Sequence, residues 1–323
     1  MQQVEQGARP ASKPFSLDAY IAIARPDHWF KNVFVLPGAA LAMAVTGNIG
    51  FVPLWNILLA VIATCLIASA NYTINEWLDA EFDQHHPIKK HRPSVSGGVK
   101  AKFVYIQYAL LSITGLGLGF VVSPLCMYAL LFLLIMGVAY NVRPMRTKDR
   151  AYLDVISESI NNPIRFMIGW FAVVTTLFPP SSILLAYWTG GAFLMATKRF
   201  AEYRYIGDPD RAGLYRASFK HYTEERLLLS SFFYALVSAF FFGVFLIKYK
   251  IELILVCPFL AFLFTWYFQM SLAKGSTAQT PEKLYKEKKF VAFVGLLSAL
   301  VIALVLIDIP YLEFLTEYVV TGE

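Results

Sequence analysis

Long runs of apolar residues alternate with short polar segments along the whole chain. Each run is close to the roughly 20 residues that an α-helix needs to cross a bilayer. Nine such runs occur, at residues 29–47, 52–75, 102–122, 124–141, 153–178, 181–201, 226–247, 251–270 and 290–309. The pattern predicts an all-α integral membrane protein with nine transmembrane helices.

The segments that flank this array suggest a simple division of the chain. We expect residues 1–28 to form a cytoplasmic N-terminus with an interfacial helix, because residues 15–25 are amphipathic. Residues 29–309 would form a single transmembrane domain, and residues 310–323 a C-terminal tail. No short apolar region with a small-residue cleavage site follows Arg9 and Lys13, so we expect no cleavable signal.

The composition fits a chain that is solvated by lipid. Hydrophobic residues make up 57% of the sequence and charged residues only 15%, whereas a soluble domain has roughly 25% charged residues. The three cysteines lie far apart in apolar runs, which excludes a disulfide framework or a cysteine metal site. A water-soluble fold is therefore not expected.

Basic residues predict the orientation in the membrane. With the N-terminus in the cytoplasm, 25 of the 28 Lys and Arg residues fall in segments on the cytoplasmic side. The opposite side receives only Lys248 and Lys250, and Arg165 lies inside an apolar run. Cytoplasmic loops of membrane proteins carry the excess of Lys and Arg. We therefore expect a multi-pass protein of the inner (plasma) membrane, with its polar chemistry facing the cytoplasm.

A first acidic cluster follows the second apolar run. Asn75, Asp79 and Asp83 are spaced by four residues and share one helical face, which Glu76 borders. Acids this close repel one another unless a cation neutralises them. Oxygen ligands without cysteine favour a hard cation such as Mg²⁺. We predict that Asn75, Glu76, Asp79 and Asp83 bind magnesium; the alternative is a solvated helix end with ordinary surface acids.

Basic residues come directly after these acids. Lys89 and Arg92 are candidates for binding phosphate, arginine through its two-pronged guanidinium. Gly97 and Gly98 would let the backbone approach a ligand closely. A membrane anchor that follows the positive-inside rule is the alternative explanation of Lys89 and Lys90.

A second acidic cluster lies at the start of the fifth apolar run. Asp154, Glu158, Asn161 or Asn162, and Arg165 would share one helical face. At 1.5 Å per residue, Arg165 would lie about 15 Å below the membrane surface. A charge at that depth must face the interior and meet a partner. Asn162 and Arg165 are therefore candidates for binding phosphate, and a structural pair of Glu158 with Arg165 through an intervening group is the alternative.

Lys198 and Arg199 form a further basic patch at the end of the sixth run. The small residues Gly190, Gly191 and Ala201 allow close helix packing, which would turn these cations inward to bind phosphate. The alternative is a belt of snorkelling anchors at the membrane surface.

The acidic and basic motifs together resemble a known family. Asn75-Glu76-x-x-Asp79-x-x-x-Asp83, followed by His86-Pro87-x-Lys89-x-x-Arg92-Pro93, is similar to the first signature of the UbiA prenyltransferase superfamily. The resemblance implies a nine-helix bundle around a central cavity, with a Mg²⁺-bound diphosphate at its cytoplasmic end. Glu76 departs from the aspartate that is usual there.

Two more segments narrow the resemblance. The His-Pro-x-Lys-x-x-Arg-Pro form, and Lys198-Arg199-Phe200-Ala201-Glu202, look most like the decaprenyl-phosphate phosphoribosyltransferase branch. Residues 140–149 resemble the loop before the second Asp-rich motif, where Tyr and Lys are typical. Tyr140 and Lys148 are therefore added to the candidate substrate-binding residues.

These features predict a transferase that displaces pyrophosphate, with Mg²⁺ as its cofactor. Asp79, Asp83, Asp154 and Glu158 would form its catalytic centre. The donor would be phosphoribosyl diphosphate and the acceptor a polyprenyl phosphate. One alternative is a prenyltransferase that joins a polyprenyl diphosphate to an aromatic acceptor, and another is a transporter. Contact with membrane lipid is expected and a nucleic-acid partner is not; the oligomeric state is left open.

Overall fold

The computed structural model describes residues 16–84, 91–96, 98–273, 275–279 and 281–315, and these ranges contain helices but no strand. The α-helices are α1 (Leu17–Ala24), α2 (Leu36–Thr46), α3 (Phe51–Asp83), α4 (Ala101–Val122), α5 (Pro124–Asn141), α6 (Leu153–Ser159), α7 (Asn161–Phe171), α8 (Ser181–Ile206), α9 (Pro209–Tyr215), α10 (Glu224–Tyr249), α11 (Cys257–Ser271) and α12 (Lys288–Leu306). Short 3₁₀ helices join them: η1 (Pro26–Val35), η3 (Thr147–Asp149), η4 (Ala217–His221), η5 (Ile251–Val256), η6 (Thr277–Gln279), η7 (Pro281–Lys286) and η8 (Pro310–Leu315). The predicted all-α class is confirmed.

Seven helical segments of the described chain are long and apolar enough to cross a membrane. They cover residues 17–46, 51–81, 101–122, 124–141, 224–249, 251–271 and 288–306. The expected run at 153–178 is divided between α6 and α7, of 7 and 11 residues, and α8 carries Lys198, Arg199 and Glu202 near its end. The chain is thus a multi-pass helical protein, and nine crossings stay a prediction.

Large apolar side chains cover the outside of the bundle. Phe51, Phe120, Phe232 and Leu296 are all more than 60% exposed. A protein in water rarely exposes contiguous apolar surface on this scale. These side chains are therefore suited to contact with lipid.

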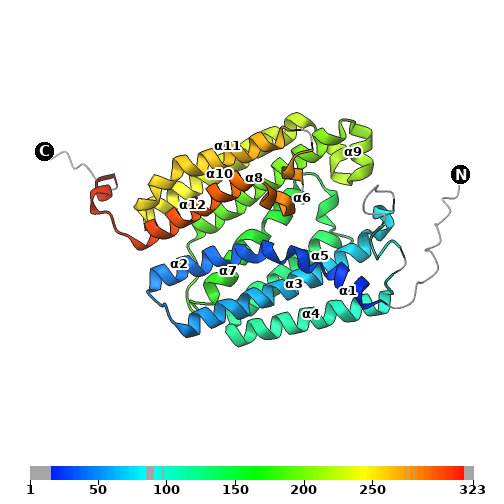
Figure 1. Cartoon of the computed structure of the whole chain (residues 1–323), viewed down its shortest axis with the longest axis horizontal. Coiled ribbons are helices and arrows are strands. Elements are labelled where there is room, and N and C mark those ends of the chain that lie inside the picture. The colour runs from blue at the N-terminus through cyan, green and yellow to red at the C-terminus, as the bar shows by residue number, and fades with distance from the viewer. Residues whose placement is uncertain (1–15, 85–90, 97, 274, 280, 316–323) are drawn as a thin grey trace, which may run out of the picture.

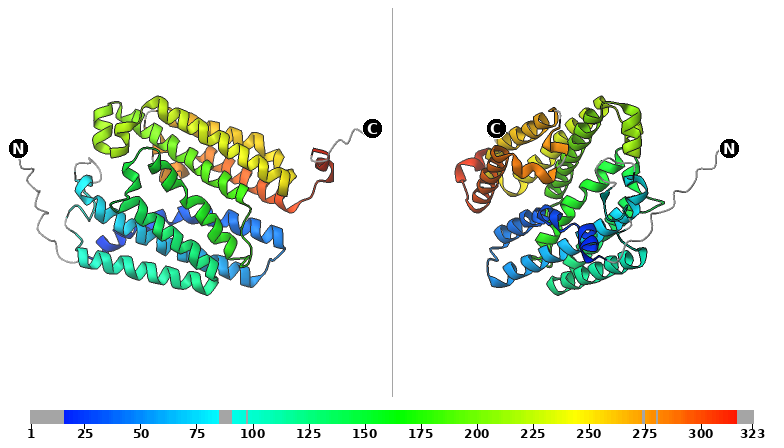
Figure 2. Two further views of the ribbon diagram at one scale, coloured as in Figure 1. Left: turned by 180° about the vertical axis from the view of Figure 1, so that it is seen from behind. Right: turned by 45° about the vertical axis from the view of Figure 1, so that its right-hand side comes forward.

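The helices fall into two groups that lie side by side (Figures 1 and 2). One group contains α2, α3, α4, α5 and α7; the other contains α8, α10, α11 and α12. Within the groups α3 packs on α4, α2 on α7, and α8 on α10. The elements α1 and η8 lie at opposite ends of the bundle (Figure 1).

Two glycines allow α2 and α7 to touch through their backbones. A Cβ added to Gly38 would lie 1.9 Å from the carbonyl oxygen of Phe166, and one added to Gly169 would lie 1.9 Å from that of Val35. Any side chain at either position would force the helices apart. This contact also brings η1 alongside α7, where Arg165 lies.

One end of the bundle carries α1, residues 91–96 and 98–100, η3, α9 and η4 (Figure 1), and we call it the polar end. Capping residues end or begin the helices at this end. Gly207, at φ +67°, ends α8, and the Asp208 side chain accepts from the backbone N–H of Arg211 at 3.1 Å to cap α9. Thr223 caps α10 in the same way, through the N–H of Arg226 at 3.1 Å.

Candidate active site

The first acidic cluster lies on the last turns of α3, which continues past residue 75 to Asp83. Asn75 donates through Nδ2 to Asp79 Oδ2 at 3.2 Å, and also to Asn141 Oδ1 at the end of α5. The predicted shared face of Asn75 and Asp79 is therefore present. It points toward the loop that follows α5.

Glu76 and Asp83 are joined by a single arginine. Arg92 donates from Nη1 to Asp83 Oδ2 at 2.6 Å, and its Nε lies 3.9 Å from Glu76 Oε2. Ser94 Oγ lies 3.4 Å from the other oxygen of Glu76. Glu76 is buried and contacts Arg92 and Ser94, and the Mg²⁺-ligand role expected for it stays a prediction.

The loop after α5 reaches Asp79 with two cations. Lys148 Nζ lies 2.5 Å from Asp79 Oδ1 and 3.0 Å from Asn141 Oδ1, and Arg146 Nη2 lies 2.9 Å from the same carboxylate oxygen. The backbone of this loop is unusual, because Arg146 and Tyr152 have φ values of 30° and 65°. Strained backbone of this kind is concentrated at functional sites.

Two of these partners were absent from the predicted set. Arg146 and Asn141 both lie in the segment that resembles the family, next to Tyr140 and Lys148, and that adjacency was the available signal. Lys148, predicted to bind phosphate, lies in this cluster. Burial lowers the pKa of Lys148 to about 8, although the Asp79 carboxylate opposes this fall.

We call this set the α3 site: Asn75, Glu76, Asp79, Asp83, Arg92, Asn141, Arg146, Lys148 and Asp149. Arg146 also pairs with Asp149 at 2.8 Å. Within the described chain, four carboxylates thus meet three cations. An excess of negative charge remains, which is the condition under which a cation binds.

The donors of the α3 site fit a magnesium ion that is shared with a ligand. No three His, Cys, Asp or Glu side chains of the described residues are grouped closely enough to enclose a metal alone. Mg²⁺ typically uses one or two carboxylates and completes its shell with water and phosphate oxygens. Asp79 and Asp83, one helical turn apart, meet that requirement.

The second acidic cluster surrounds one buried arginine. Arg199 is 1% exposed and donates to three carboxylates: Nε to Asp154 at 3.2 Å, Nη2 to Glu158 at 2.8 Å, and Nη1 to Glu202 at 3.1 Å. We call Asp154, Glu158, Arg199, Glu202 and Arg216 the Arg199 cluster. The inward direction predicted for Arg199 is confirmed, but its guanidinium is already occupied by protein carboxylates.

Asp154 is enclosed by the segment that precedes α10. Its side chain is fully buried, with Tyr222 OH donating to Oδ1 at 2.8 Å and Ser218 Oγ to Oδ2 at 3.1 Å. Arg216 lies 3.7 Å from Oδ2. Burial and the Asp154 charge raise the pKa of Tyr222, so the phenol stays protonated as a donor. Asp154 is therefore placed to hold the cluster together and not to face a ligand.

Tyr140 connects the α3 site with the Arg199 cluster. Its hydroxyl donates to Glu158 Oε2 at 2.9 Å, and Lys148 Nζ lies 6.0 Å from the centre of its ring. Glu158 is about one-third exposed, unlike Asp154. Tyr140 therefore lies between Lys148 of the α3 site and Glu158 of the Arg199 cluster.

Arg165 faces the interior, as predicted, but its partners differ from the expected ones. Its Nε donates to Asn32 Oδ1 at 3.0 Å and its Nη1 lies 3.4 Å from the Asn161 carbonyl oxygen. The helix is interrupted at Ile160 between α6 and α7, and the alternative of a pair with Glu158 through an intervening group stays a prediction. Asn32 was missed because it lies in an apolar run, far from any motif.

The remaining predicted residues are placed as follows. Asn162 packs against Gly191. A Cβ added to Gly191 would lie 2.2 Å from Asn162 Nδ2. Lys198 is half-buried and close enough to Glu158 for their charges to interact. Lys89 lies outside the described residues.

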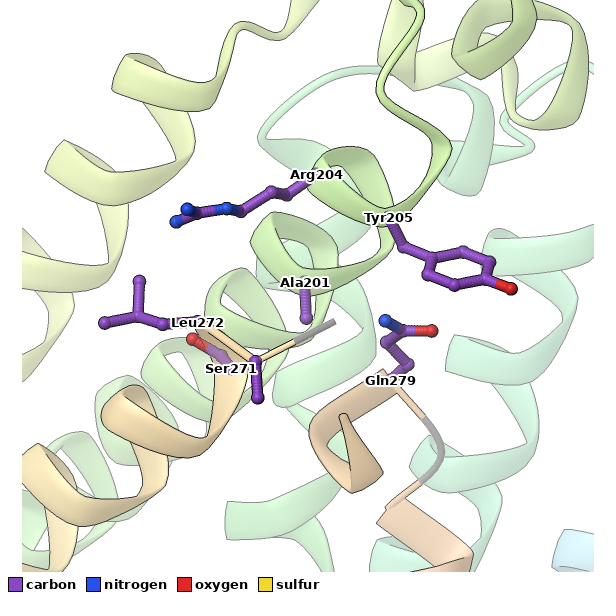
Figure 3. A pocket seen from close by; sticks show the side chains of 7 residues that line it. Ala201, Arg204, Tyr205, Ser271, Leu272 and Gln279 are labelled. Atoms are coloured by element: carbon purple, nitrogen blue, oxygen red, sulfur yellow. The ribbon is translucent and has the colours of Figure 1, made fainter. Parts of the chain in front are cut away.

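A pocket of about 190 Å³ lies at the C-terminal ends of α8 and α11 (Figure 3). Its lining includes Tyr205, Gln279 and Ser271, with Arg204 as the charged residue among the described side chains. None of the acids of the two clusters lines it, so it is separate from the candidate site.

Comparisons with known proteins agree with this architecture. A sequence profile of the UbiA prenyltransferase family matches residues 33–307. Decaprenyl-phosphate phosphoribosyltransferase of Mycobacterium tuberculosis is 30% identical over 179 residues, which cover 55% of this chain and 58% of that protein. The protein of the same name from Mycolicibacterium smegmatis is 29% identical over 227 residues, 69% of each chain.

A solved structure gives independent support for the fold. A UbiA homolog from Archaeoglobus fulgidus, bound to GPP and Mg²⁺, superposes with a TM-score of 0.67 at 20% identity, over 89% of this chain and 98% of that one. The match to the M. tuberculosis protein spans 58% of that protein's length. The family profile covers most of the chain, and the chain therefore belongs to the UbiA prenyltransferase family of membrane transferases.

Proposed function

We propose that this transferase moves a 5-phosphoribosyl group from phosphoribosyl diphosphate to a polyprenyl phosphate. The observation that carries the proposal is that three cations, Arg92, Arg146 and Lys148, contact the α3 carboxylates, with Lys198 close to Glu158 nearby. These substrates together bring a diphosphate and two phosphate monoesters, so a site that binds them needs several separate cations. Transfer of a prenyl group to an aromatic acceptor requires only one diphosphate to be held.

In the proposed reaction, the bond between C1 of the ribose and the diphosphate oxygen breaks. An oxygen of the lipid phosphate forms a new bond to C1, and pyrophosphate leaves. A magnesium ion held by Asp79 and Asp83 would neutralise the negative charge that grows on the leaving pyrophosphate. Transition-state charge is stabilised best by donors that are fixed in advance.

Side chains of this protein would share that work. Lys148 and Arg146 are held beside Asp79, so they can exchange carboxylate for phosphate contacts without moving far. Arg92 would do the same beside Asp83. Tyr140, hydrogen-bonded to Glu158, would close the site toward the Arg199 cluster. Asp154 and Arg199 would act as positioning residues that fix Glu158.

The proposed location is the plasma membrane, with the polar end in the cytoplasm. The support for this orientation is the distribution of basic residues, which gather in the segments at the polar end. Phosphoribosyl diphosphate, as a charged cytosolic metabolite, would then reach the α3 site directly from water. The polyprenyl chain would enter from the bilayer.

A second candidate is prenyl transfer from a polyprenyl diphosphate to an aromatic acceptor. The observation that favours it is the fold shared with the A. fulgidus homolog, which is described with bound GPP and Mg²⁺. In that case the same α3 site would hold the prenyl diphosphate. The basic residues outside the α3 site would then have no phosphate group to bind.

A two-donor assay separates the candidates. The full chain in nanodiscs receives Mg²⁺ with either ribose-labelled phosphoribosyl diphosphate and polyprenyl phosphate, or labelled polyprenyl diphosphate and 4-hydroxybenzoate. We expect organic-extractable ribose label in the first arm. Label in the aromatic product of the second arm, with none in the first, would overturn the proposal in favour of the prenyltransferase.

A further inference from the structure

The loop between α5 and α6, residues 142–152, carries both cations that contact Asp79. We call it the 142–152 loop. Its backbone has positive φ at Arg146 and Tyr152, 30° and 65°. Residues other than glycine rarely adopt such angles, and they do so where surrounding contacts hold the backbone in place. The position of Arg146 and Lys148 at the α3 site therefore depends on the contacts that hold this loop.

One phenol holds the C-terminal end of the loop. Tyr222 OH accepts a hydrogen bond from the backbone N–H of Tyr152 at 2.6 Å and donates its own hydrogen to Asp154 Oδ1 at 2.8 Å. A tyrosine hydroxyl can do both at once, because it has one hydrogen and free lone pairs. The rings of Tyr152 and Tyr222 also meet edge-on, with centroids 5.2 Å apart. Tyr152 is thus held through both its main chain and its side chain.

Tyr222 itself is fixed by the other group of helices. It is 3% exposed and lies in one apolar cluster with Phe200 of α8 and Leu227 of α10. The next residue, Thr223, caps α10. These contacts fix the phenol on α8 and α10, whereas the 142–152 loop extends from α5 and meets α3. Tyr222 therefore links the two groups of helices at the polar end.

A second contact holds the middle of the loop. Thr147 Oγ1 and Ser157 Oγ of α6 share a hydrogen bond of 2.8 Å, directly beside Lys148 in the sequence. The N–H of Arg150 donates to the Thr147 carbonyl at 3.1 Å, and the N–H of Asp154 donates to the Arg150 carbonyl at 3.0 Å. A short series of hydrogen bonds therefore runs from the start of α6 back to the residue that precedes Lys148.

We infer that Tyr222 is a positioning residue, whose hydroxyl keeps the 142–152 loop in the conformation that presents Lys148 and Arg146 to the diphosphate. It would act through Tyr152 and the loop, without binding substrate. The inference rests on the proposed function for the identity of the diphosphate. The contacts of Tyr222 serve prenyl transfer equally well, because that reaction also requires a diphosphate at the α3 site.

Ser218 on η4 provides a matched comparison. Its hydroxyl donates to the same carboxylate, at Asp154 Oδ2 and 3.1 Å. Ser218→Ala therefore removes one hydrogen bond to Asp154. Tyr222→Phe removes one hydrogen bond to Asp154 and, in addition, the acceptor for the Tyr152 N–H, while the ring is kept. A difference between the two variants measures the hold on the loop.

Hydrogen exchange of the ligand-free protein tests this hold directly. The full chain in nanodiscs is compared as wild type, Tyr222→Phe, Ser218→Ala and Tyr205→Phe, in which an exposed tyrosine of α8 is the control. We expect amide exchange in residues 146–152 to accelerate about tenfold in Tyr222→Phe, which corresponds to roughly 1.4 kcal/mol, the size of one hydrogen bond. Exchange in the other two variants should stay within about twofold of the wild type. An unchanged rate in Tyr222→Phe would overturn the inference.

Binding of pyrophosphate with Mg²⁺ shows whether the loop acts through Lys148. Pyrophosphate is the leaving group in both candidate reactions, so this titration does not depend on the choice between them. We expect Tyr222→Phe and Lys148→Met each to weaken binding about tenfold, and the double variant to lose no more than either alone, because both changes remove the same contact. Separate losses that multiply to about 100-fold would mean that Tyr222 does not act through Lys148. An equal loss in Ser218→Ala would assign the effect to Asp154. Either result would overturn the inference.

Thr147→Val decides the question if Tyr222→Phe proves unstable in thermal unfolding. It removes the other contact that holds the loop, leaves Tyr222 in place, and should also weaken pyrophosphate binding about tenfold. Wild-type affinity in Thr147→Val would then contradict the role of the loop contacts. If exchange and pyrophosphate binding behave as expected but no ribose label is transferred, the proposed reaction fails and the role of Tyr222 stands.

Discussion

Lys148, on the loop after α5, lies 2.5 Å from Asp79 on α3, across 69 residues of sequence. This contact joins the first acidic cluster to a strained loop and sets the direction in which the carboxylate faces. Because the neighbouring Arg146 contacts the same oxygen, Asp79 lies between two cations that a phosphate could use.

Asp79→Asn should lower kcat by about 100-fold or more, as expected when a preorganised electrostatic group is lost at an active site. The substitution keeps the shape of the side chain, so thermal stability should change little. Glu81→Gln, an exposed acid on the same helix, is the control and should retain activity. A fully active Asp79→Asn protein would remove Asp79 from the catalytic centre.

Lys148→Met should raise KM for the donor diphosphate about tenfold, since one hydrogen bond to a charged group contributes roughly 1.5–3 kcal/mol. Lys148→Arg keeps a cation at the position and should recover part of the loss. Initial rates over a range of donor concentrations provide the measurement. Equal donor KM values in Lys148→Met and the wild type would mean that Lys148 serves only to hold Asp79.

Arg199→Met should destabilise the protein by about 3–5 kcal/mol, because it leaves buried carboxylates without their cation. Arg204→Met removes an exposed pair with Glu224 and should cost no more than about 1 kcal/mol. Thermal unfolding in detergent compares the two. If Arg199→Met unfolds like the wild type and instead raises the donor KM, Arg199 binds phosphate directly, as the sequence first suggested.

Arg165→Lys should reduce kcat/KM at least about tenfold, the effect of losing one well-placed charged hydrogen bond. Lysine keeps the charge but loses the Nε donor to Asn32. Asn32→Ala removes the partner and keeps the guanidinium, so it separates the two roles. Activity that falls in Asn32→Ala but not in Arg165→Lys would indicate that the pair has only a structural function.

Much of the fold follows from apolar periodicity. The expected runs at 102–122 and 124–141 match α4 and α5 within a residue, because Ser123 and Pro124 mark the boundary between them. The interruption of the fifth run at Ile160 lies close to Pro163, which lacks the backbone N–H that would otherwise bond to the Ser159 carbonyl. A kink near this proline is therefore predictable from the sequence.

The candidate site was predictable where spacing along one helix decides it. Asn75 and Asp79 meet as their four-residue spacing requires, and Lys148 was found through a motif. The enclosure of Asp154 by Tyr222 and Ser218 was not predicted, because spacing along one helix does not show which distant segment packs over a buried acid. For the same reason Asn32 could not be assigned to Arg165.

The account depends most on the carboxylates of α3 making the reaction dependent on a divalent cation. Pyrophosphate release from phosphoribosyl diphosphate and polyprenyl phosphate is therefore the most direct measurement, made with the full chain in nanodiscs, with Mg²⁺ or with EDTA. We predict release only with Mg²⁺ in the wild type, and almost none in Asp79→Asn or Asp83→Asn under either condition. Release that continues in EDTA, or at the wild-type rate in both variants, would contradict the account.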